Sequence, residues 1–189
     1  MIDEYSQEEK IELLKLARKT ITRYLKEGRK DSDETKNPKF REKRGVFVTL
    51  HKHGDLRGCI GYPLPIDSLY RAVMDNAVAS SVEDPRFPPV TAGELEEIDI
   101  EISVLTVPQK VKGSEDVVVG RDGIIISKGF QRGLLLPQVP VEQGWDLEEY
   151  ISYGCRKAGL AEDEWKKGNV EIETFQGVVF GEKELLTTG

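Results

Sequence analysis

Cysteine and histidine are scarce in this chain of 189 residues, which contains two of each. Cys59 and Cys155 are too few for a disulfide framework, and their separation matches neither a zinc ribbon nor a Cys-x-x-Cys redox pair. Long apolar runs are also missing, because no stretch approaches the roughly 20 apolar residues of a membrane helix. The acidic N-terminus lacks the basic and apolar runs of a signal peptide, so the cytoplasm is the expected location.

Basic residues are also fewer than acidic residues. Lys and Arg number 27 against 34 Asp and Glu, a net charge of −7, which argues against binding to a membrane surface or a nucleic-acid backbone. Charged residues make up 32% of the chain, which fits the composition of heat-adapted proteins. The hydrophobic fraction of 38% is enough for a packed core, and the length suits a single domain over residues 1–189 with room for a smaller subdomain within it.

Local signals predict both helices and strands. Capping boxes, in which a polar residue is followed three positions later by glutamate, predict helix starts at Ser6, Thr91 and Asp146. Alternating apolar and polar residues predict a half-buried strand over 98–104. Further strands are expected at 46–51, 56–60, 117–119, 124–127, 134–136, 170–175 and 178–180, and a helix from about residue 67. The fold class is therefore α+β, with helices packed on a mostly antiparallel sheet.

The hexapeptide LRGCIG, residues 56–61, is the strongest candidate for a functional site. It lies on the second strand of a predicted hairpin, where residues two apart share a face, so Arg57 and Cys59 are expected to project together as a catalytic pair. A guanidinium beside a thiol favours the thiolate, which is the nucleophilic form. Gly58 and Gly61 permit a concave run of backbone amides, which can hold an anionic substrate group.

These residues also have plainer interpretations. A cysteine in a half-buried strand usually packs as a small hydrophobe, and a strand arginine is commonly satisfied by a structural salt bridge. Metal ligation by Cys59 together with a histidine is a further alternative, although the sequence does not favour it.

The register of the hairpin decides whether a histidine can assist Cys59. A two-residue turn, Gly54–Asp55, pairs Leu50 with Cys59 and turns both histidines away from it. A turn one residue longer pairs Thr49 with Cys59 and places His51 on its side. We favour the two-residue turn, because it directs the apolar residues of the first strand together towards the core.

Four further residues are candidates for substrate binding. Tyr62 follows the hexapeptide directly. Asp84 and Arg86 belong to a rigid segment with three prolines, DPRFPPV, where they either line a cleft or pair with each other to fix the loop. Gln138 is the polar residue of the segment LLLPQVP, which is predicted to leave a buried strand and enter a bent loop.

Several segments, taken in order, resemble one protein family. They are GVFVTL, LRGCIGYP, DPRFPPV, VGRDGIII, GLLLPQV and KAGL. The chain is similar over nearly its whole length to the AMMECR family, named for a candidate gene in the Alport, midface hypoplasia, intellectual disability and elliptocytosis deletion region. The family's hallmark, LRGCIG, stands complete at residues 56–61.

The resemblance has limited implications for function. It implies an α+β fold with a larger sheet-and-helix part and a smaller subdomain, but no established enzymatic activity. In prokaryotes the family's genes often stand beside those of a Memo-like protein and a radical S-adenosylmethionine enzyme, which implies a shared pathway or complex. Such an association does not define a mechanism.

Three hypotheses of function remain open. The first is an enzyme, or an accessory subunit of one, that uses Cys59 and Arg57 on a small anionic or electrophilic substrate; no motif calls for a metal or a cofactor. The second is a non-catalytic module that binds a partner protein through a cleft formed by the hairpin and the proline loops. The third, nucleic-acid binding through the basic loop Lys36–Arg44, is the weakest because of the net negative charge.

Overall fold

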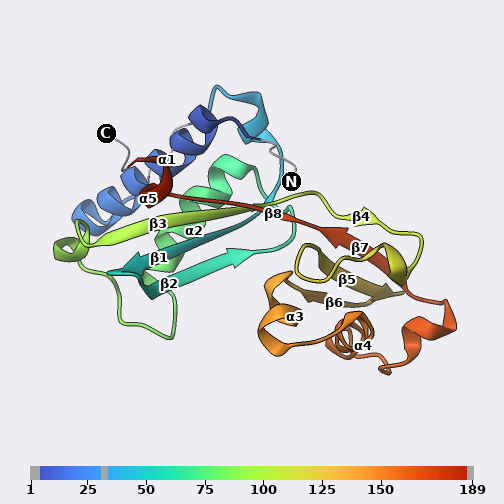
Figure 1. The fold of residues 1–189 in the computed structure, drawn as a ribbon. Helices are drawn as coiled ribbons and strands as arrows, with labels where there is room; N and C mark the ends of the chain where they lie inside the picture. The colour runs from blue at the N-terminus through green and yellow to red at the C-terminus, as the bar shows by residue number, and fades with distance from the viewer. Residues whose placement is uncertain (1–4, 31–33, 187–189) are drawn as a thin grey trace. The chain divides into compact units, whose positions relative to one another are not determined.

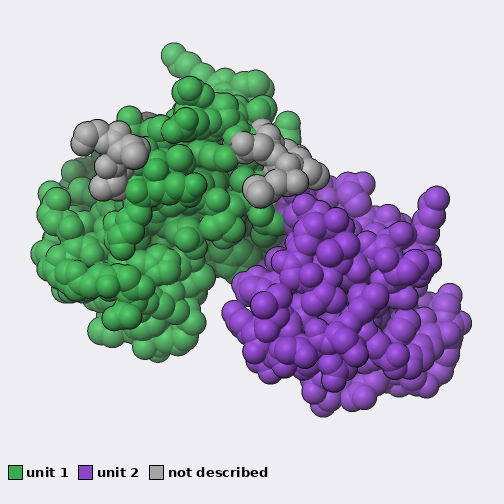
Figure 2. All heavy atoms as spheres, viewed as in Figure 1, with its two compact units in different colours: residues 1–105, 177–189 green, residues 106–176 purple. Residues whose placement is uncertain are grey.

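The computed structural model describes residues 5–30 and 34–186, and the chain forms two compact units. Unit 1 comprises residues 1–105 and 177–189, and unit 2 comprises residues 106–176 (Figure 2). Each unit contains a four-stranded sheet in which all the neighbouring strands are antiparallel. The predicted α+β fold class is therefore confirmed.

Unit 1 is built on a sheet with the strand order β2-β1-β3-β8 (Figure 1). Its strands are β1 (Gly45–Lys52), β2 (Asp55–Tyr62), β3 (Ile98–Leu105) and β8 (Gly177–Gly181). Its helices are α1 (Gln7–Glu27), α2 (Leu69–Val82) and α5 (Glu182–Leu185), with the short 3-10 helices η1 (Pro38–Arg41) and η2 (Ala92–Glu94). Strand β2, which carries the hexapeptide, lies at one edge of this sheet.

The helices of unit 1 cover one face of its sheet. The alternate residues Val46, Val48 and Leu50 of β1 are fully buried and join a core with residues of α1 and α2. The residues between them on β1, Phe47 and Thr49, are only half-buried, because they face the other side of the sheet. We call this second side the open face; no helix of the described part of unit 1 packs on it (Figure 1).

Capping explains where the long helices begin and end. Ser6 and Glu9 form the predicted capping box of α1, and Gly28 ends this helix in the left-handed conformation. Asp146 and Glu149 form a second capping box, at the start of α4. No helix of the described ranges is both long enough and apolar enough to cross a lipid bilayer.

Unit 2 has a second sheet with the strand order β4-β7-β5-β6. Its elements are β4 (Gln109–Lys110), η3 (Ser114–Asp116), β5 (Gly123–Lys128), β6 (Gln131–Leu135), α3 (Gln138–Gln143), α4 (Leu147–Lys157), η4 (Glu164–Lys167) and β7 (Glu171–Phe175). A separate core forms between this sheet and α4, where Ile124, Tyr150 and Cys155 are fully buried. Each unit therefore has its own hydrophobic core.

The structure differs from the sequence-based expectation in several local details. The strands form two sheets instead of one. Strands β4 to β7 pair with one another in unit 2, and the chain then returns to the sheet of unit 1 as β8. Residues 117–119 form no strand; Val117 follows η3, and the N–H of Val118 donates to the Asp122 carboxylate. The predicted bent loop after β6 contains the short helix α3, and the basic loop contains η1, with Phe40 fully buried.

The close approach of β2 to α2 requires a glycine at position 58. A Cβ atom built on Gly58 would lie 2.1 Å from the carbonyl oxygen of Ser80, which belongs to the backbone of α2. Backbone atoms of a packed helix cannot move aside without disturbing their neighbours. Gly58 is therefore required by packing between the edge strand and the helix.

Replacing Gly58 by alanine should destabilise the protein. We expect a loss of at least about 2 kcal/mol in the free energy of unfolding, because the strand and helix must separate to admit the methyl group. Urea denaturation followed by circular dichroism measures this loss. Gly93→Ala is the control: the nearest atom to its new Cβ would be Thr91 Oγ1 at 3.9 Å, so a change within about 0.5 kcal/mol is expected. Equal losses in the two variants would contradict this account.

Candidate functional site

The hairpin that carries the hexapeptide has a different register from the one favoured by the sequence. Its turn is His53–Gly54, with positive φ angles of 54° and 96°, as type I′ turns require. Lys52 pairs with Asp55, and Thr49 pairs with Cys59. The predicted Gly54–Asp55 turn is therefore wrong.

A β-bulge at Arg57 explains this register. Leu50 pairs with Gly58 and His51 pairs with Leu56, so Arg57 is the extra residue of β2. The partner of Leu50 must face the core, and the bulge places a glycine there instead of an arginine. Packing against α2 therefore selects the register, through the same contact that requires Gly58.

The new register changes the position of one histidine relative to Cys59. His51 lies two residues from Thr49 on β1, so it shares the open face with Thr49 and Cys59 and is half-buried. The expectation that both histidines turn away from Cys59 is thus wrong for His51. His53 is exposed in the turn, where its ring contacts the Glu97 carboxylate at 3.2 Å.

The backbone of Cys59 is held from outside the sheet by two side chains. Its N–H donates to the Asp84 carboxylate at 2.8 Å, and its carbonyl oxygen accepts from the Arg86 guanidinium at 3.4 Å. Because β2 is an edge strand, the N–H and carbonyl group of Cys59 have no partner strand on this side. The side chains of Asp84 and Arg86 provide their hydrogen-bond partners instead. They fix the position of Cys59 along the edge of the sheet.

The sulfur of Cys59 has a polar neighbour. The Thr49 hydroxyl contacts it at 3.2 Å. Because the backbone groups of Cys59 point away from β1, these two residues form a non-hydrogen-bonded pair, in which side chains approach closely. Cys59 is partly exposed, whereas Cys155 is fully buried in the core of unit 2. Cys59 is therefore not one of the buried residues that form the two cores.

Asp84 and Arg86 pair with each other, one of the two arrangements considered from the sequence. The Asp84 side chain is 3% exposed and accepts hydrogen bonds from the Arg86 guanidinium at 2.7 and 3.0 Å. The hydrogen bonds from Arg86, joined by those from the backbone N–H groups of Cys59 and Arg86, hold the pKa of Asp84 well below its usual range. The pKa of Arg86 is raised, first by Asp84 and also by the charge of Cys59.

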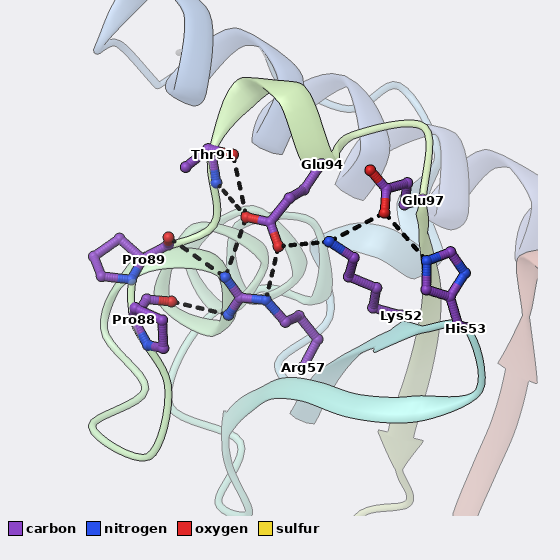
Figure 3. A network of polar contacts seen from close by, with 8 residues as sticks. All are labelled: Lys52, His53, Arg57, Pro88, Pro89, Thr91, Glu94 and Glu97. Carbon is purple, nitrogen blue, oxygen red and sulfur yellow. Dashed lines mark hydrogen bonds and ion pairs between the residues drawn. The ribbon is translucent and has the colours of Figure 1, made fainter.

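Arg57 is used in a separate structural network (Figure 3). Its guanidinium donates to both oxygens of Glu94, at 3.1 and 3.2 Å, and to the carbonyl oxygens of Pro88 and Pro89. The side chain is only 13% exposed. This network joins the bulge of β2 to η2 and to the proline loop. Arg57 therefore forms a structural salt bridge, which is the plainer of the interpretations considered from the sequence.

Glu94 is the acceptor at the centre of this network. Hydrogen bonds from Arg57 lower its pKa to about 2, with further contributions from the Thr91 N–H and the Lys52 ammonium. Thr91 and Glu94 also form the capping box predicted from the sequence. The expectation that Arg57 and Cys59 project together therefore needs correction: the guanidinium bonded to Cys59 is that of Arg86, because the bulge breaks the two-residue alternation at Arg57.

The remaining predicted site residues lie in different surroundings. Gly61 packs on Phe47, since an added Cβ would lie 2.6 Å from its ring. Tyr62 packs against the core of unit 1, and burial raises its pKa to about 12, with Asp75 and Asp67 adding to the effect. Gln138 is exposed at the start of α3, in unit 2, whereas all the other predicted site residues belong to unit 1.

The comparisons with known proteins identify the family. The AMMECR1 family model matches residues 14–180. The chain belongs to the AMMECR1 family. Similar archaeal proteins occur in Methanopyrus kandleri, 48% identical over 91% of this chain and 87% of that protein, and in Thermococcus gammatolerans, 47% identical over 90% and 89%. The crystal structure of an uncharacterised protein from Pyrococcus horikoshii, 44% identical, covers 90% of each chain with a TM-score of 0.72.

Two residues of this AMMECR1-family site were not recognised in the sequence. Thr49 contacts the Cys59 sulfur. This contact depends on the hairpin register, which differs from the one favoured by the sequence. Glu94 was recognised only as part of a capping box, although it also binds Arg57. In the described part of the chain, no three His, Cys, Asp or Glu side chains are grouped closely enough to hold a metal ion.

The basic loop of this AMMECR1-family chain is engaged in internal contacts. Lys39 pairs with Glu9 at 2.9 Å, and Arg44 pairs with Glu42 at 2.7 Å. The Arg41 guanidinium donates to the carbonyl oxygen of Thr35. Part of the positive charge of this loop is therefore used within the chain.

Asp84→Asn tests how strongly the edge of β2 depends on the buried carboxylate. At pH 7 we expect a loss of about 3 kcal/mol in the free energy of unfolding, because the Arg86 charge loses its partner and the bond to the Cys59 N–H weakens. The exposed Asp75, which pairs with Lys30, supplies the control variant Asp75→Asn, and its replacement should have a small effect.

The pH dependence of the same difference is a second measurement. Asp84 has a lowered folded pKa, so its contribution is fully present above the unfolded pKa of about 3.9 and is lost as the pH falls through the folded value. The stability gap between wild type and Asp84→Asn should therefore stay constant from pH 7 to about 5 and narrow only below about pH 4. A gap that already narrows above pH 5 would show that another group is responsible.

Proposed function

We propose that this AMMECR1-family chain uses the Cys59 thiol on a small electrophilic or anionic molecule, as an enzyme or as an accessory subunit of one. The observation that carries the proposal is the setting of Cys59: the residue is partly exposed, the Thr49 hydroxyl lies 3.2 Å from its sulfur, and its backbone is bonded to Asp84 and Arg86. A group held in this way is oriented before a substrate arrives, and preorganised polar groups are what catalytic and binding sites require.

The groups around the sulfur are suited to a nucleophile. The Thr49 hydroxyl is able to donate to a thiolate and stabilise its charge. The Arg86 side chain is 54% exposed, so its guanidinium remains accessible to a carboxylate, a phosphate or a polarised carbonyl of a ligand beside Cys59. In this proposal Arg86 takes the electrostatic role that the sequence assigned to Arg57, and Arg57 supports the site by holding the loop.

Alkylation by iodoacetamide, followed by peptide mass spectrometry, measures the reactivity of each thiol. The thiolate attacks the carbon, an S–C bond forms, iodide leaves with the electron pair of the C–I bond, and the thiol proton passes to solvent. Cys59 should react readily in the folded protein. Cys155 should stay inert, because it is fully buried and burial raises the pKa of its thiol.

Variants of the two neighbours identify the source of this reactivity. Thr49→Val should slow the alkylation of Cys59 by about tenfold, the usual effect of losing one hydrogen bond to a charged group. Arg86→Gln should also slow it, because a positive charge that interacts with Cys59 is lost. Thr49→Ser retains the hydroxyl and should react like wild type. Arg121→Gln is the matched control, because Arg121 forms a similar pair with Asp122 in unit 2 and is 55% exposed. A Cys59 as inert as Cys155 would rule out this proposal.

The proline loop supports a second candidate function, a non-catalytic module that binds a partner protein. The three prolines of this loop, Pro85, Pro88 and Pro89, are exposed. The loop is held by hydrogen bonds from Arg57 to the carbonyl oxygens of Pro88 and Pro89 and from the Arg86 N–H to Asp84. A rigid exposed loop loses little conformational entropy when a partner binds. The family resemblance suggests a Memo-like protein or a radical S-adenosylmethionine enzyme as the partner.

Calorimetric titration of the purified chain with each of these two proteins tests the second function. Pro88→Asp should weaken binding at least about tenfold, because it places a charge in the proposed interface. Ile66→Asp is the control, since Ile66 is an exposed apolar residue of unit 1 outside the loop. Absence of binding to both proteins, or equal weakening by the two variants, would count against this function.

A further inference from the structure

Three polar side chains form one row across the open face of the sheet in unit 1. Cys59 on β2 pairs with Thr49 on β1, and Thr49 pairs with Glu101 on β3. The row ends at Gly181 on β8, which pairs with Glu101. Residues paired across adjacent strands project to the same face, so the thiol, the hydroxyl and the carboxylate share one surface.

Glu101 differs from three nearby carboxylates of unit 1, which are ion-paired. Asp99 pairs with Lys183 at 2.8 Å, Glu94 binds Arg57 and Lys52, and Glu182 binds Arg18. Within residues 5–30 and 34–186, Glu101 has neither an ion pair nor a side-chain hydrogen bond, although it is only half exposed. A carboxylate that has lost part of its hydration without gaining a counterion is a favourable place for a cation.

The two cross-strand neighbours of Glu101 do not block such a cation. Its strand neighbour Gly181 has no side chain, and even an added Cβ there would lie 3.9 Å from the Glu101 Cβ. Thr49 on the other side is short and points its hydroxyl towards Cys59. A ligand can therefore lie along the row without displacing a large side chain.

We propose that the row Cys59–Thr49–Glu101 binds a small electrophile that carries a cationic group, with the electrophilic atom at the sulfur and the cation at the carboxylate. This inference rests on the proposed function of Cys59 and adds a class of substrate to it. Adjacent strands are about 4.8 Å apart, so the backbones of β2 and β3 are separated by about 10 Å. A ligand that contacts both side chains must bridge these two strands, as a short amine-bearing molecule can.

Three methanethiosulfonates, one cationic, one neutral and one anionic, provide the test, because they differ in charge but react with thiols in the same way. The Cys59 thiolate attacks the sulfenyl sulfur, a disulfide forms, methanesulfinate leaves with the electron pair of the broken S–S bond, and the thiol proton passes to solvent. The probes are the trimethylammonioethyl, methyl and sulfonatoethyl reagents, used at equal ionic strength. Peptide mass spectrometry of the full-length protein separates modification of Cys59 from that of Cys155.

The expected result is a preference of Cys59 for the cationic reagent, with a rate that saturates as the reagent concentration rises. Glu101→Gln should lower the ratio of the cationic to the neutral rate by at least about fivefold, because one charge near the bound cation is lost. Glu96→Gln is the matched control, since it changes the net charge equally at an exposed position of unit 1. Circular dichroism verifies that both variants are folded.

The outcomes separate this inference from the function on which it rests. A ratio that falls in Glu101→Gln and not in Glu96→Gln supports the cation site. A Cys59 that reacts with the neutral reagent but shows the same ratio in both variants would overturn the cation site and leave the reactive thiol intact. A Cys59 that reacts with none of the three reagents would overturn the proposed function and, with it, the inference.

Discussion

The hydrogen bond from the Cys59 N–H to the buried Asp84 carboxylate is the interaction on which the rest of the site depends. It joins the edge strand β2 to the loop that follows α2, over a sequence separation of 25 residues. The carboxylate is 3% exposed and must stay charged to hold Arg86 as well. Because a buried charge without partners is very unfavourable, strand, loop and guanidinium are stable only in this common arrangement.

The hexapeptide LRGCIG has a largely structural role in this protein. Gly58 allows β2 to rest on the backbone of α2, and Gly61 allows it to pack on Phe47. Arg57 fills the bulge and binds Glu94 and the proline loop. Among these residues the side chain of Cys59 is the one directed to the open face, next to Thr49. The rigidity of the motif and the partial exposure of Cys59 therefore have one origin, which is the packing of an edge strand against a helix and a loop.

Two ion pairs hold the two ends of the proline loop. Arg86 and Asp84 act on its first part, and Arg57 and Glu94 act on its last part. In both pairs the carboxylate accepts from a guanidinium and from backbone N–H groups, so both carboxylates have lowered pKa values. The prolines between them restrict the backbone further. A loop fixed at both ends presents the same surface to every ligand, whether the ligand is a small molecule or a protein.

Features that depend on local spacing could be predicted from the amino-acid sequence. Capping boxes marked the starts of α1, η2 and α4, alternation marked β3, and the pattern of elements gave an α+β class that the structure confirms. The register at Cys59, the partner of Arg57 and the division into two sheets could not be predicted, because they depend on contacts in the folded chain. The reason is that a bulge is selected by contacts with α2, η2 and the proline loop, which are distant in sequence, whereas capping and alternation involve residues only a few positions apart.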